Sequence, residues 1–361
     1  MISGGGTGGH IFPAIAIANS LKKKHPDAEF LFVGALGRME MEKVPEAGYK
    51  IEGLPIMGIQ RRLTVKNLML PFKLLKSMLK ARKLIKEFKP HIAIGVGGYA
   101  SGPLLRAANN AGVPTLLQEQ NSFAGLTNKL LAKKAKLVCV AYPEMDKFFP
   151  KDRILITGNP VRSEVVKLDG KRQRALEFFN LENDKKVILV VGGSLGAWSI
   201  NEGVGNSLKH WEKEGVQLIW QTGKLYHERA MEQAKPYENW VKVQQFIKRM
   251  DLAYAAADLV VSRAGAIAVS ELCLVKKPSI FVPLPSAAED HQTKNAMVLV
   301  NRQAASLIKD QEVKDGLAAT VSDLLAKPEE LNKMSERMES LGYHDAADLI
   351  ADQAIKIMDR G

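Results

Sequence analysis

The amino-acid sequence predicts an α/β protein with two domains of the nucleotide-binding type, each built on a parallel β-sheet. Two glycine-rich loops are the first indication: Gly4 to Gly9 opens the chain, and Gly192 to Gly196 lies near its middle. Such loops are typical of the turn between a parallel strand and the next helix, where backbone amides bind phosphate or another anion. The chain of 361 residues is also longer than one hydrophobic core usually grows.

The second indication is the alternation of apolar runs with amphipathic segments of helix length. In the first half of the chain we expect buried strands at 30–33, 91–96, 114–117, 137–141 and 153–157. This rhythm indicates a parallel sheet with crossover helices.

The rhythm stops at the turn Gly158-Asn159-Pro160 and restarts after a polar segment. Further strands are expected at 186–191, 217–221, 241–244, 259–262 and 279–282. We therefore place one domain at 1–158 and the second at 159–342. The remaining segment, 343–361, carries apolar residues at helical spacing and is expected to pack one face.

The positive charge of the chain is concentrated in one half. The net charge is +12, yet residues 1–160 hold 24 Lys and Arg against 11 Asp and Glu, while the remaining residues hold 27 against 28. A one-sided basic domain indicates an anionic partner, either an acidic membrane face or nucleic acid. Cys139 and Cys273 lie in apolar runs and are expected to be buried thiols in a reducing compartment. No apolar run approaches the roughly 18 residues of a spanning helix, so we expect a cytoplasmic location.

The first glycine loop fits the dinucleotide-binding pattern only formally. That pattern also requires an acidic residue at the end of the second strand, where this chain has Gly34-Ala35, so nicotinamide and flavin binding are disfavoured. His10 is expected in the first turn of the following helix, where the helix dipole favours a neutral ring that can accept a proton. An ordinary histidine at a helix start, without chemistry, is the alternative.

Polar residues follow several predicted strands, at the sheet edge where ligands bind in open α/β folds. The segments 118–121 and 95–103 are expected to meet the first loop in one cleft. In the second domain, Glu271 could accept hydrogen bonds from a sugar diol or could be a solvated residue of a first helical turn. No cluster has metal-ligand spacing, so we expect neither a metal nor another cofactor.

Taken in order, these motifs make the whole chain resemble the bacterial peptidoglycan glycosyltransferases that add N-acetylglucosamine to undecaprenyl-pyrophosphoryl-N-acetylmuramyl-pentapeptide. The matching motifs are 5–14, 97–103, 119–128, 158–162, 192–197, 262–266 and 290–292. The resemblance implies the GT-B fold, which has two Rossmann-like domains with parallel sheets facing across a cleft and a C-terminal helix that returns to the first domain.

The resemblance also implies roles for residues at matching positions. Ser194 and its loop would meet the diphosphate of UDP-N-acetylglucosamine, Glu271 the ribose and Gln292 the sugar. The backbone of Ile247 would read the uracil, and Arg162 would lie near the nucleotide. The full set of implied donor residues is Thr7, Gly8, Gly9, Asn121, Arg162, Ser194, Ile247, Ala266, Ile267, Ala268, Val269, Ser270, Glu271 and Gln292. Tyr99 and Asn128 would lie on the acceptor side.

The implied reaction inverts the anomeric centre. The 4-hydroxyl of the muramyl sugar attacks N-acetylglucosamine and UDP leaves, which requires a base and positive electrostatics. His10 is the expected base, with Glu119 as its rival or its orienting partner. The chain departs from many family members at Gln118, where they have His, and at Ala268, where they have Thr.

A lipid-linked acceptor implies contact with the anionic inner leaflet, and hence a peripheral location on the cytoplasmic face of the membrane. The segments 59–63 and 65–89 mix apolar and basic residues as such contact requires, although 65–89 also fits an ordinary crossover helix. A UDP-N-acetylglucosamine 2-epimerase of the same fold is the alternative enzyme. Nucleic-acid binding has only the charge in its favour, because the aromatic and basic interleaving of single-strand binders is missing.

Overall fold

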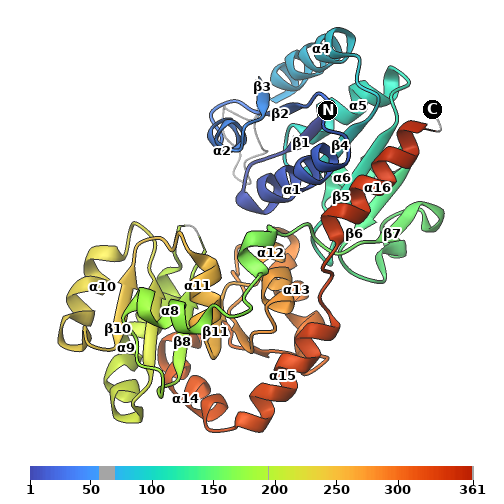
Figure 1. Ribbon diagram of the computed structural model, residues 1–361. Helices are drawn as coiled ribbons and strands as arrows, with labels where there is room; N and C mark the ends of the chain where they lie inside the picture. Colours follow the sequence, from blue (N-terminus) through green and yellow to red (C-terminus); the bar gives the residue numbers. More distant parts are fainter. Residues whose placement is uncertain (57–69, 194, 360–361) are drawn as a thin grey trace. The chain divides into compact units, whose positions relative to one another are not determined.

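The computed structural model describes residues 1–56, 70–193 and 195–359 (Figure 1). The chain divides into two compact units, which we treat separately. Unit 1 comprises Met1–Arg162 together with Tyr343–Gly361, and unit 2 comprises Ser163–Gly342.

Unit 1 contains a seven-stranded sheet in which all pairs are parallel, in the order β3-β2-β1-β4-β5-β6-β7. Its strands are β1 (Ile2–Gly4), β2 (Leu31–Ala35), β3 (Lys50–Leu54), β4 (Ala93–Gly97), β5 (Thr115–Glu119), β6 (Leu137–Val140) and β7 (Ile154–Ile156). Successive strands are added toward one edge of the sheet from β1 to β3 and toward the other edge from β4 to β7, so the strand order reverses between β1 and β4. In open α/β sheets, ligands bind at the carboxyl ends of the strands beside this reversal.

Helices cover both faces of this sheet. They are α1 (Gly8–Lys24), α2 (Glu40–Glu46), α4 (Leu70–Phe88), α5 (Ser101–Asn110), α6 (Leu126–Ala132) and α16 (Ala346–Asp359), with short 3-10 turns at Met145–Lys147 and Lys151–Arg153. Neighbouring strand residues point to opposite faces. Leu116 therefore joins the core formed by α1 and α16, whereas Leu117 joins the core formed by α4 and α5.

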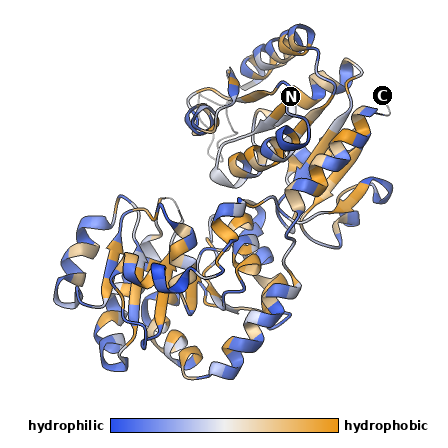
Figure 2. Cartoon of the chain, viewed as in Figure 1, coloured by the Kyte–Doolittle hydropathy of each residue, from blue (hydrophilic) through white to orange (hydrophobic). Residues whose placement is uncertain are grey.

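Unit 2 repeats the arrangement with six parallel strands in the order β10-β9-β8-β11-β12-β13. The strands are β8 (Val187–Val191), β9 (Gln217–Gln221), β10 (Val241–Gln244), β11 (Leu259–Ser262), β12 (Ser279–Phe281) and β13 (Ser306–Leu307). The helices are α7 (Ser163–Val166), α8 (Arg172–Phe179), α9 (Trp198–Glu214), α10 (His227–Ala234), α11 (Met250–Ala256), α12 (Ala266–Leu274), α13 (His291–Val300), α14 (Val313–Leu325) and α15 (Pro328–Ser340), with 3-10 turns at Lys235–Tyr237 and Ala288–Asp290. Figure 2 shows the apolar strands of both units between helices whose outer faces are hydrophilic.

The two parallel sheets confirm the fold class that the sequence predicts. Three strands have no counterpart among the expected ranges. β1 is the short strand before the first glycine loop, and β3 and β13 each lie at the edge of their sheet. In β3, Lys50 is exposed and Glu52 half-buried, so the strand lacks a continuous apolar run. Both cysteines are buried as expected, and burial raises the pKa of each thiol to about 12. Within the described residues, no helix combines the length and the apolar character that crossing a membrane requires.

Candidate functional site

The loops after β1 and β4 of unit 1 are in contact at the sheet's reversal point. The Gly5 amide donates a hydrogen bond to the Gly97 carbonyl at 3.3 Å. Gly97 has φ +107°, and a Cβ there would lie 2.6 Å from Nδ1 of His10. Gly98 has φ +87°, and its Cβ would lie 2.4 Å from the Gly5 carbonyl oxygen. Only glycine at these two positions lets the loops approach so closely.

His10 lies in the first turn of α1, as the sequence predicts, and is half-buried. Its Nδ1 is 2.9 Å from Oε1 of Gln120. Nε2 of Gln120 donates to the Val96 carbonyl at 2.6 Å, so this side chain connects α1 to the end of β4. Three polar residues at the end of β5, Gln118, Glu119 and Gln120, are almost completely buried. The expected proximity of these segments within unit 1 is thus present.

Both oxygens of the Glu119 carboxylate accept hydrogen bonds. Oε1 accepts from the Asn121 amide at 3.1 Å, and Oε2 accepts from the Gly125 amide at 3.1 Å and from Nδ2 of Asn128 at 2.9 Å. The side chain is only 2% exposed. Glu119 therefore fixes the loop that precedes α6 and the first turn of that helix.

Glu40, which is not among the sequence-predicted site residues, occupies the first glycine loop. Its Oε2 accepts from the Gly6 amide at 2.8 Å and its Oε1 from the Ala35 amide at 3.0 Å, and the residue is 1% exposed. A Cβ on Gly5 would lie 2.2 Å from Oε1 of Glu40, and one on Gly34 would lie 2.6 Å from its Cγ. The loop thus already holds a carboxylate belonging to its own chain. The two glycines around Glu40 were the only sequence signal for it.

The other predicted residues of unit 1 lie around these loops. Thr7 is the N-cap residue of α1, and within the described part of the chain its hydroxyl makes no capping hydrogen bond. Gly8 and Gly9 begin the helix. The Arg162 guanidinium lies over the Phe12 ring, with Cζ 4.7 Å from the ring centroid. Tyr99, in the loop after β4, is 47% exposed.

The second glycine loop, in unit 2, is built differently. Gly193 and Gly196 have φ of +90° and +79°, and a Cβ on Gly196 would lie 2.1 Å from the Thr222 carbonyl oxygen. Among the residues that the structure describes, no acidic side chain accepts a hydrogen bond from an amide of this loop. The loop leads into α9, a helix of 17 residues whose amino end favours anions. Ser194, predicted to meet the diphosphate, lies outside the described residues.

The predicted donor residues 266–271 form α12, which begins after Gly265. Val269 is 1% exposed and packs in the core, whereas Ile267, Ala268 and Ser270 are half-buried. Ala266 is 9% exposed, and its carbonyl accepts from the Ser270 hydroxyl at 3.0 Å. The alternative that Glu271 is a solvated first-turn residue is wrong, because it lies in the second turn and accepts from the Tyr254 hydroxyl at 2.9 Å.

Two further donor candidates lie in loops or helix starts at the carboxyl edge of the second sheet. Gln292, in the first turn of α13, accepts at Oε1 from the Leu284 amide at 3.0 Å. Ile247 follows β10 and is buried, with 3% of the residue exposed.

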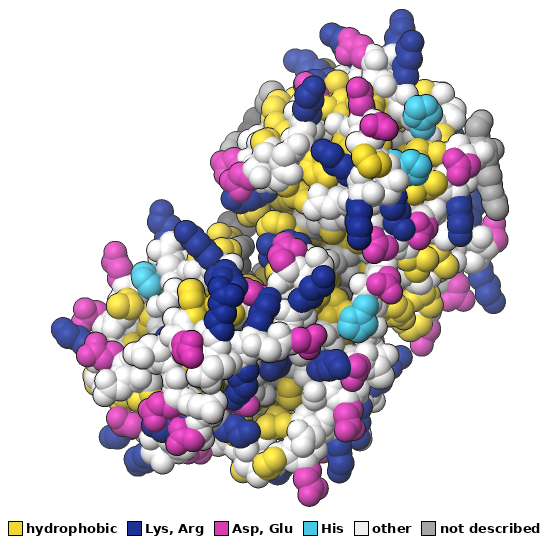
Figure 3. Space-filling view, viewed as in Figure 1, with side chains coloured by type: hydrophobic (Ala, Val, Ile, Leu, Met, Phe, Trp, Pro, Cys, Tyr) yellow, Lys and Arg dark blue, Asp and Glu magenta, His cyan; other side chains and the backbone are white. Residues whose placement is uncertain are grey.

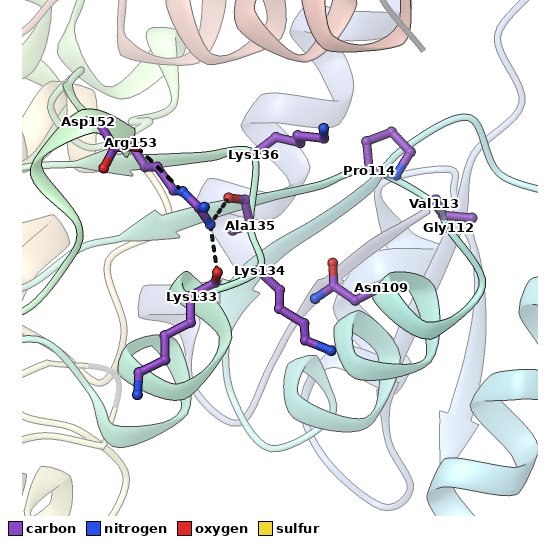
Figure 4. A pocket seen from close by; sticks show the side chains of 10 residues that line it. All are labelled: Asn109, Gly112, Val113, Pro114, Lys133, Lys134, Ala135, Lys136, Asp152 and Arg153. Carbon is purple, nitrogen blue, oxygen red and sulfur yellow. Dashed lines mark hydrogen bonds and ion pairs between the residues drawn. The ribbon is translucent and has the colours of Figure 1, made fainter.

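A separate hollow of about 450 Å³ lies in unit 1 at the amino ends of β5 and β6 (Figure 4). Three lysines line it, Lys133, Lys134 and Lys136, and the Arg153 guanidinium donates to the Lys133 and Ala135 carbonyls. It contains none of the predicted site residues. In the described ranges, no group of three or more His, Cys, Asp or Glu is arranged to hold a metal ion.

Comparison with known families now identifies the class of protein. Residues 1–140 match the glycosyltransferase family 28 N-terminal domain, and residues 187–350 match the glycosyltransferase family 28 C-terminal domain. Together with the two parallel sheets, these matches define a glycosyltransferase with a GT-B-like fold of two α/β domains.

Curated relatives narrow the class. A UDP-N-acetylglucosamine--N-acetylmuramyl-(pentapeptide) pyrophosphoryl-undecaprenol N-acetylglucosamine transferase of Parabacteroides distasonis is 55% identical over 100% of this chain and 98% of its own length. A protein of the same name from Phocaeicola vulgatus is 53% identical over 100% and 96%. The chain belongs to this family of N-acetylglucosamine transferases.

Solved structures agree with this placement. The crystal structure of MurG from Acinetobacter baumannii superposes with a TM-score of 0.79 at 30% identity and covers 99% of both chains. A UDP-N-acetylglucosamine 2-epimerase superposes with a TM-score of 0.67 at 16% identity, over 100% of this chain and 95% of its own. That second likeness shows a shared fold alone.

Proposed function

We propose that this protein transfers N-acetylglucosamine from UDP-N-acetylglucosamine to the 4-hydroxyl of the muramyl sugar in undecaprenyl-pyrophosphoryl-N-acetylmuramyl-pentapeptide, with inversion at the anomeric carbon. The main support is the 55% identity, over the whole chain, to a relative whose name describes this transfer. The epimerase alternative rests on fold similarity at 16% identity.

The donor diphosphate binds at the second glycine loop. Its amides and the start of α9 supply partial positive charge to the leaving UDP, and no described carboxylate competes there. The first loop is unsuited to a diphosphate, because Glu40 already accepts from the Gly6 amide. In unit 2, Glu271 and Gln292 bind the ribose and sugar hydroxyls, as carboxylate and amide groups can.

His10 is the general base that takes the proton from the attacking hydroxyl. The engagement of Glu119 favours this choice: both of its carboxylate oxygens hold the loop before α6, and the residue is nearly inaccessible. His10 is half-buried beside two glycine loops. Asn128, on the acceptor side, and Asn121, among the donor residues, both contact Glu119.

Unit 1 binds the anionic cytoplasmic leaflet of the cell membrane, where the lipid-linked acceptor resides. The supporting surface lies on α4, where Phe72, Leu74, Leu75 and Leu79 are exposed. Lysines lie along the same helix, among them Lys76, Lys83 and Lys86. Apolar side chains edged by basic ones suit insertion beside anionic headgroups. The segment 59–63, predicted to share this role, lies outside the described residues.

The test is release of UDP from UDP-N-acetylglucosamine, measured with and without a lipid-linked muramyl-pentapeptide acceptor and in the presence of anionic vesicles. We expect release that depends on the acceptor, together with a β-1,4-linked disaccharide product. Conversion of the donor without acceptor would instead establish the epimerase. Release that requires neither acceptor nor vesicles would overturn the transferase proposal.

A further inference from the structure

Three buried amide side chains, those of Gln118, Gln120 and Asn159, form a network in which each amide atom has one possible role, and Gln120 connects this network to the candidate base. Nε2 of Gln120 faces three acceptors: the Val96 carbonyl at 2.6 Å, the Gln118 carbonyl at 3.2 Å, and Oε1 of Gln118. Two of these are backbone oxygens, which can only accept. The nitrogen of the Gln120 amide must therefore point toward Val96, and its oxygen must point toward His10.

Asn159 and Gln118 close the same network and agree with that orientation. Nδ2 of Asn159 donates to the Gln120 carbonyl at 3.0 Å, so Oδ1 of Asn159 faces the other way. That oxygen accepts from Nε2 of Gln118 at 2.9 Å, which leaves Oε1 of Gln118 to accept from Gln120. Rotating any one of these amides by 180° would place oxygen against oxygen.

Backbone carbonyls anchor the network at both ends, and none of its three amide side chains titrates. Position 118 of this chain is a glutamine. In this chain the amide cannot change its charge, so the arrangement persists across the pH range in which a histidine titrates. All three residues are buried, with exposures of 0%, 1% and 3% for Gln118, Gln120 and Asn159.

We propose that Gln120 is a positioning residue that holds the proton of neutral His10 on Nδ1. Oε1 of Gln120 can only accept, and it lies 2.9 Å from Nδ1, so Nδ1 carries the hydrogen. A neutral imidazole has one N–H, and Nε2 is therefore the nitrogen that bears the lone pair. The base of the proposed reaction is Nε2 of His10. This inference rests on the proposed function and adds the atom that accepts the proton and the residue that selects it.

The proton assignment can be measured without turnover. Full-length protein labelled with ¹⁵N-histidine gives long-range ¹H–¹⁵N correlations, which distinguish protonated from unprotonated ring nitrogens at a pH where the ring is neutral. The chain has seven histidines, and His10→Gln identifies the signals of His10 by their loss. We expect a protonated Nδ1 and an unprotonated Nε2. A proton on Nε2 in the unsubstituted protein would overturn the proposal, whatever the variants do.

A substitution of Gln120 then tests whether the position of this proton affects the rate of transfer. Gln120→Leu keeps the approximate volume and removes the acceptor, so nothing in this network holds the proton on Nδ1. We expect kcat to fall by roughly 10²-fold, near the lower end of what general base catalysis contributes, with little change in KM for the donor. The tautomer signals of His10 should change in the same sample.

Gln217→Leu is the matched control, because Gln217 is a buried glutamine at the start of β9 whose amide bonds only the backbone of Glu182 among described residues. It should lower stability while leaving kcat and the His10 signals unchanged. Full kcat in Gln120→Leu, with His10→Gln inactive, would overturn the positioning role. Absence of acceptor-dependent UDP release by the unsubstituted protein would instead overturn the proposed function, and the histidine spectrum would still support or overturn the tautomer.

Discussion

Glu40 shows how one buried side chain separates two glycine loops of similar sequence. Both loops present backbone amides at the start of a helix, which predicts anion binding for each. In unit 1 the anion is the carboxylate of Glu40, bound to the Gly6 and Ala35 amides. Glu40, at the start of α2, thus binds the Gly6 amide of the first loop, whereas no acidic side chain among the described residues accepts from an amide of the second loop.

Removing that carboxylate should destabilise the protein strongly. Glu40→Ala leaves two backbone amides without their acceptor, and hydrogen bonds to a charged group contribute roughly 1.5–3 kcal/mol each. We expect the free energy of unfolding to fall by about 3 kcal/mol, measured by denaturant titration. Glu46→Ala on the same helix is the control, since Glu46 is exposed and, among the described residues, pairs only with Lys43, and it should cost under about 1 kcal/mol. Equal effects of the two variants would contradict this account.

Gly97 offers a second test at the scale of a residue. In Gly97→Ala the new methyl group would overlap Nδ1 of His10, at 2.6 Å, in addition to the strain of φ +107°. We expect kcat to fall at least tenfold through displacement of His10, the proposed general base. Gly112→Ala is matched in backbone strain, with φ +78°, but its Cβ would meet nothing within 4 Å. Its activity should stay near normal, and a comparable loss there would show that strain alone is responsible.

Individual site residues were predicted unevenly from the sequence. His10 follows the first glycine loop and Glu119 comes shortly after the apolar residues of 114–117, so both are expected at the carboxyl edge of a parallel sheet. The contact of Glu40 with Gly6 and the contacts of Asn159 join segments far apart in the chain, and no local pattern reveals such contacts. The tautomer of His10 depends on four such segments, which is why it becomes visible only in the folded molecule.

At the scale of elements, α8 and α11 are joined through Asp251. Its carboxylate accepts from Arg249 at 2.8 Å and 2.7 Å and from Lys171 at 2.9 Å. These hydrogen bonds, first from Arg249 and then from Lys171, hold the pKa of Asp251 well below its usual range, against the opposing effect of burial. Lys171 and Arg249 are the N-cap residues of their helices, so the cluster fixes two helix starts together.

The depressed pKa predicts a pH dependence with a definite sign. The unfolded carboxyl has a pKa near 3.9, so the stabilisation by Asp251 is fully present above about pH 5 and is lost as the pH falls toward the folded pKa. Asp251→Asn should lower the free energy of unfolding by about 1–2 kcal/mol at pH 7, allowing for the solvent exposure of its partners. The difference should shrink below about pH 4 in denaturant titrations. A difference in unfolding free energy that stays constant from pH 7 to pH 3 would contradict the role given to Asp251. Asp152→Asn is the control, because the side chain of Asp152 is 80% exposed.

Most elements were predictable because buried parallel strands are continuous apolar runs. The ten strands expected at 30–33 and onward all appear, with ends shifted by one to two residues in several cases. Apart from the short β1 before the first glycine loop, the strands without an expected range are β3 and β13. Both lie at sheet edges, where one side of the strand remains unpaired and fewer residues need to be apolar. A strand at a sheet edge therefore has a weaker apolar pattern, and the prediction of strands depends on that pattern.

At the scale of the whole molecule, the surplus positive charge belongs to the half that carries the exposed apolar residues of α4. On the face shown in Figure 3, acidic and basic side chains intermingle, so no single-sign patch covers that view. The combination in unit 1 predicts membrane binding with two components. The first component is the burial of leucine side chains in the membrane. The second is the attraction of basic side chains to anionic headgroups, which is weakened by salt.

Replacing two exposed leucines should separate those components. Leu75→Ser with Leu79→Ser should weaken cosedimentation with anionic vesicles by roughly tenfold or more, because burying each leucine contributes about 1.5–3 kcal/mol. Raising the salt from about 0.1 M to 1 M shortens the Debye length from about 10 Å to 3 Å and should weaken binding of both forms. Leu225→Ser, at an 86% exposed leucine of unit 2, should bind normally. Normal binding by the double variant would exclude α4 as the membrane-contacting helix.

The division of the chain also sets an order of synthesis. Unit 2 is one continuous segment, Ser163–Gly342, inserted between the two pieces of unit 1. Helix α16, which supplies Ile350, Ala351 and Ala354 to the core beside α1, is made after unit 2. A ribosome therefore completes all of unit 2 before unit 1 receives its final helix. During that interval the apolar side of α1 stays uncovered, and a nascent chain released early would expose it to chaperones and proteases.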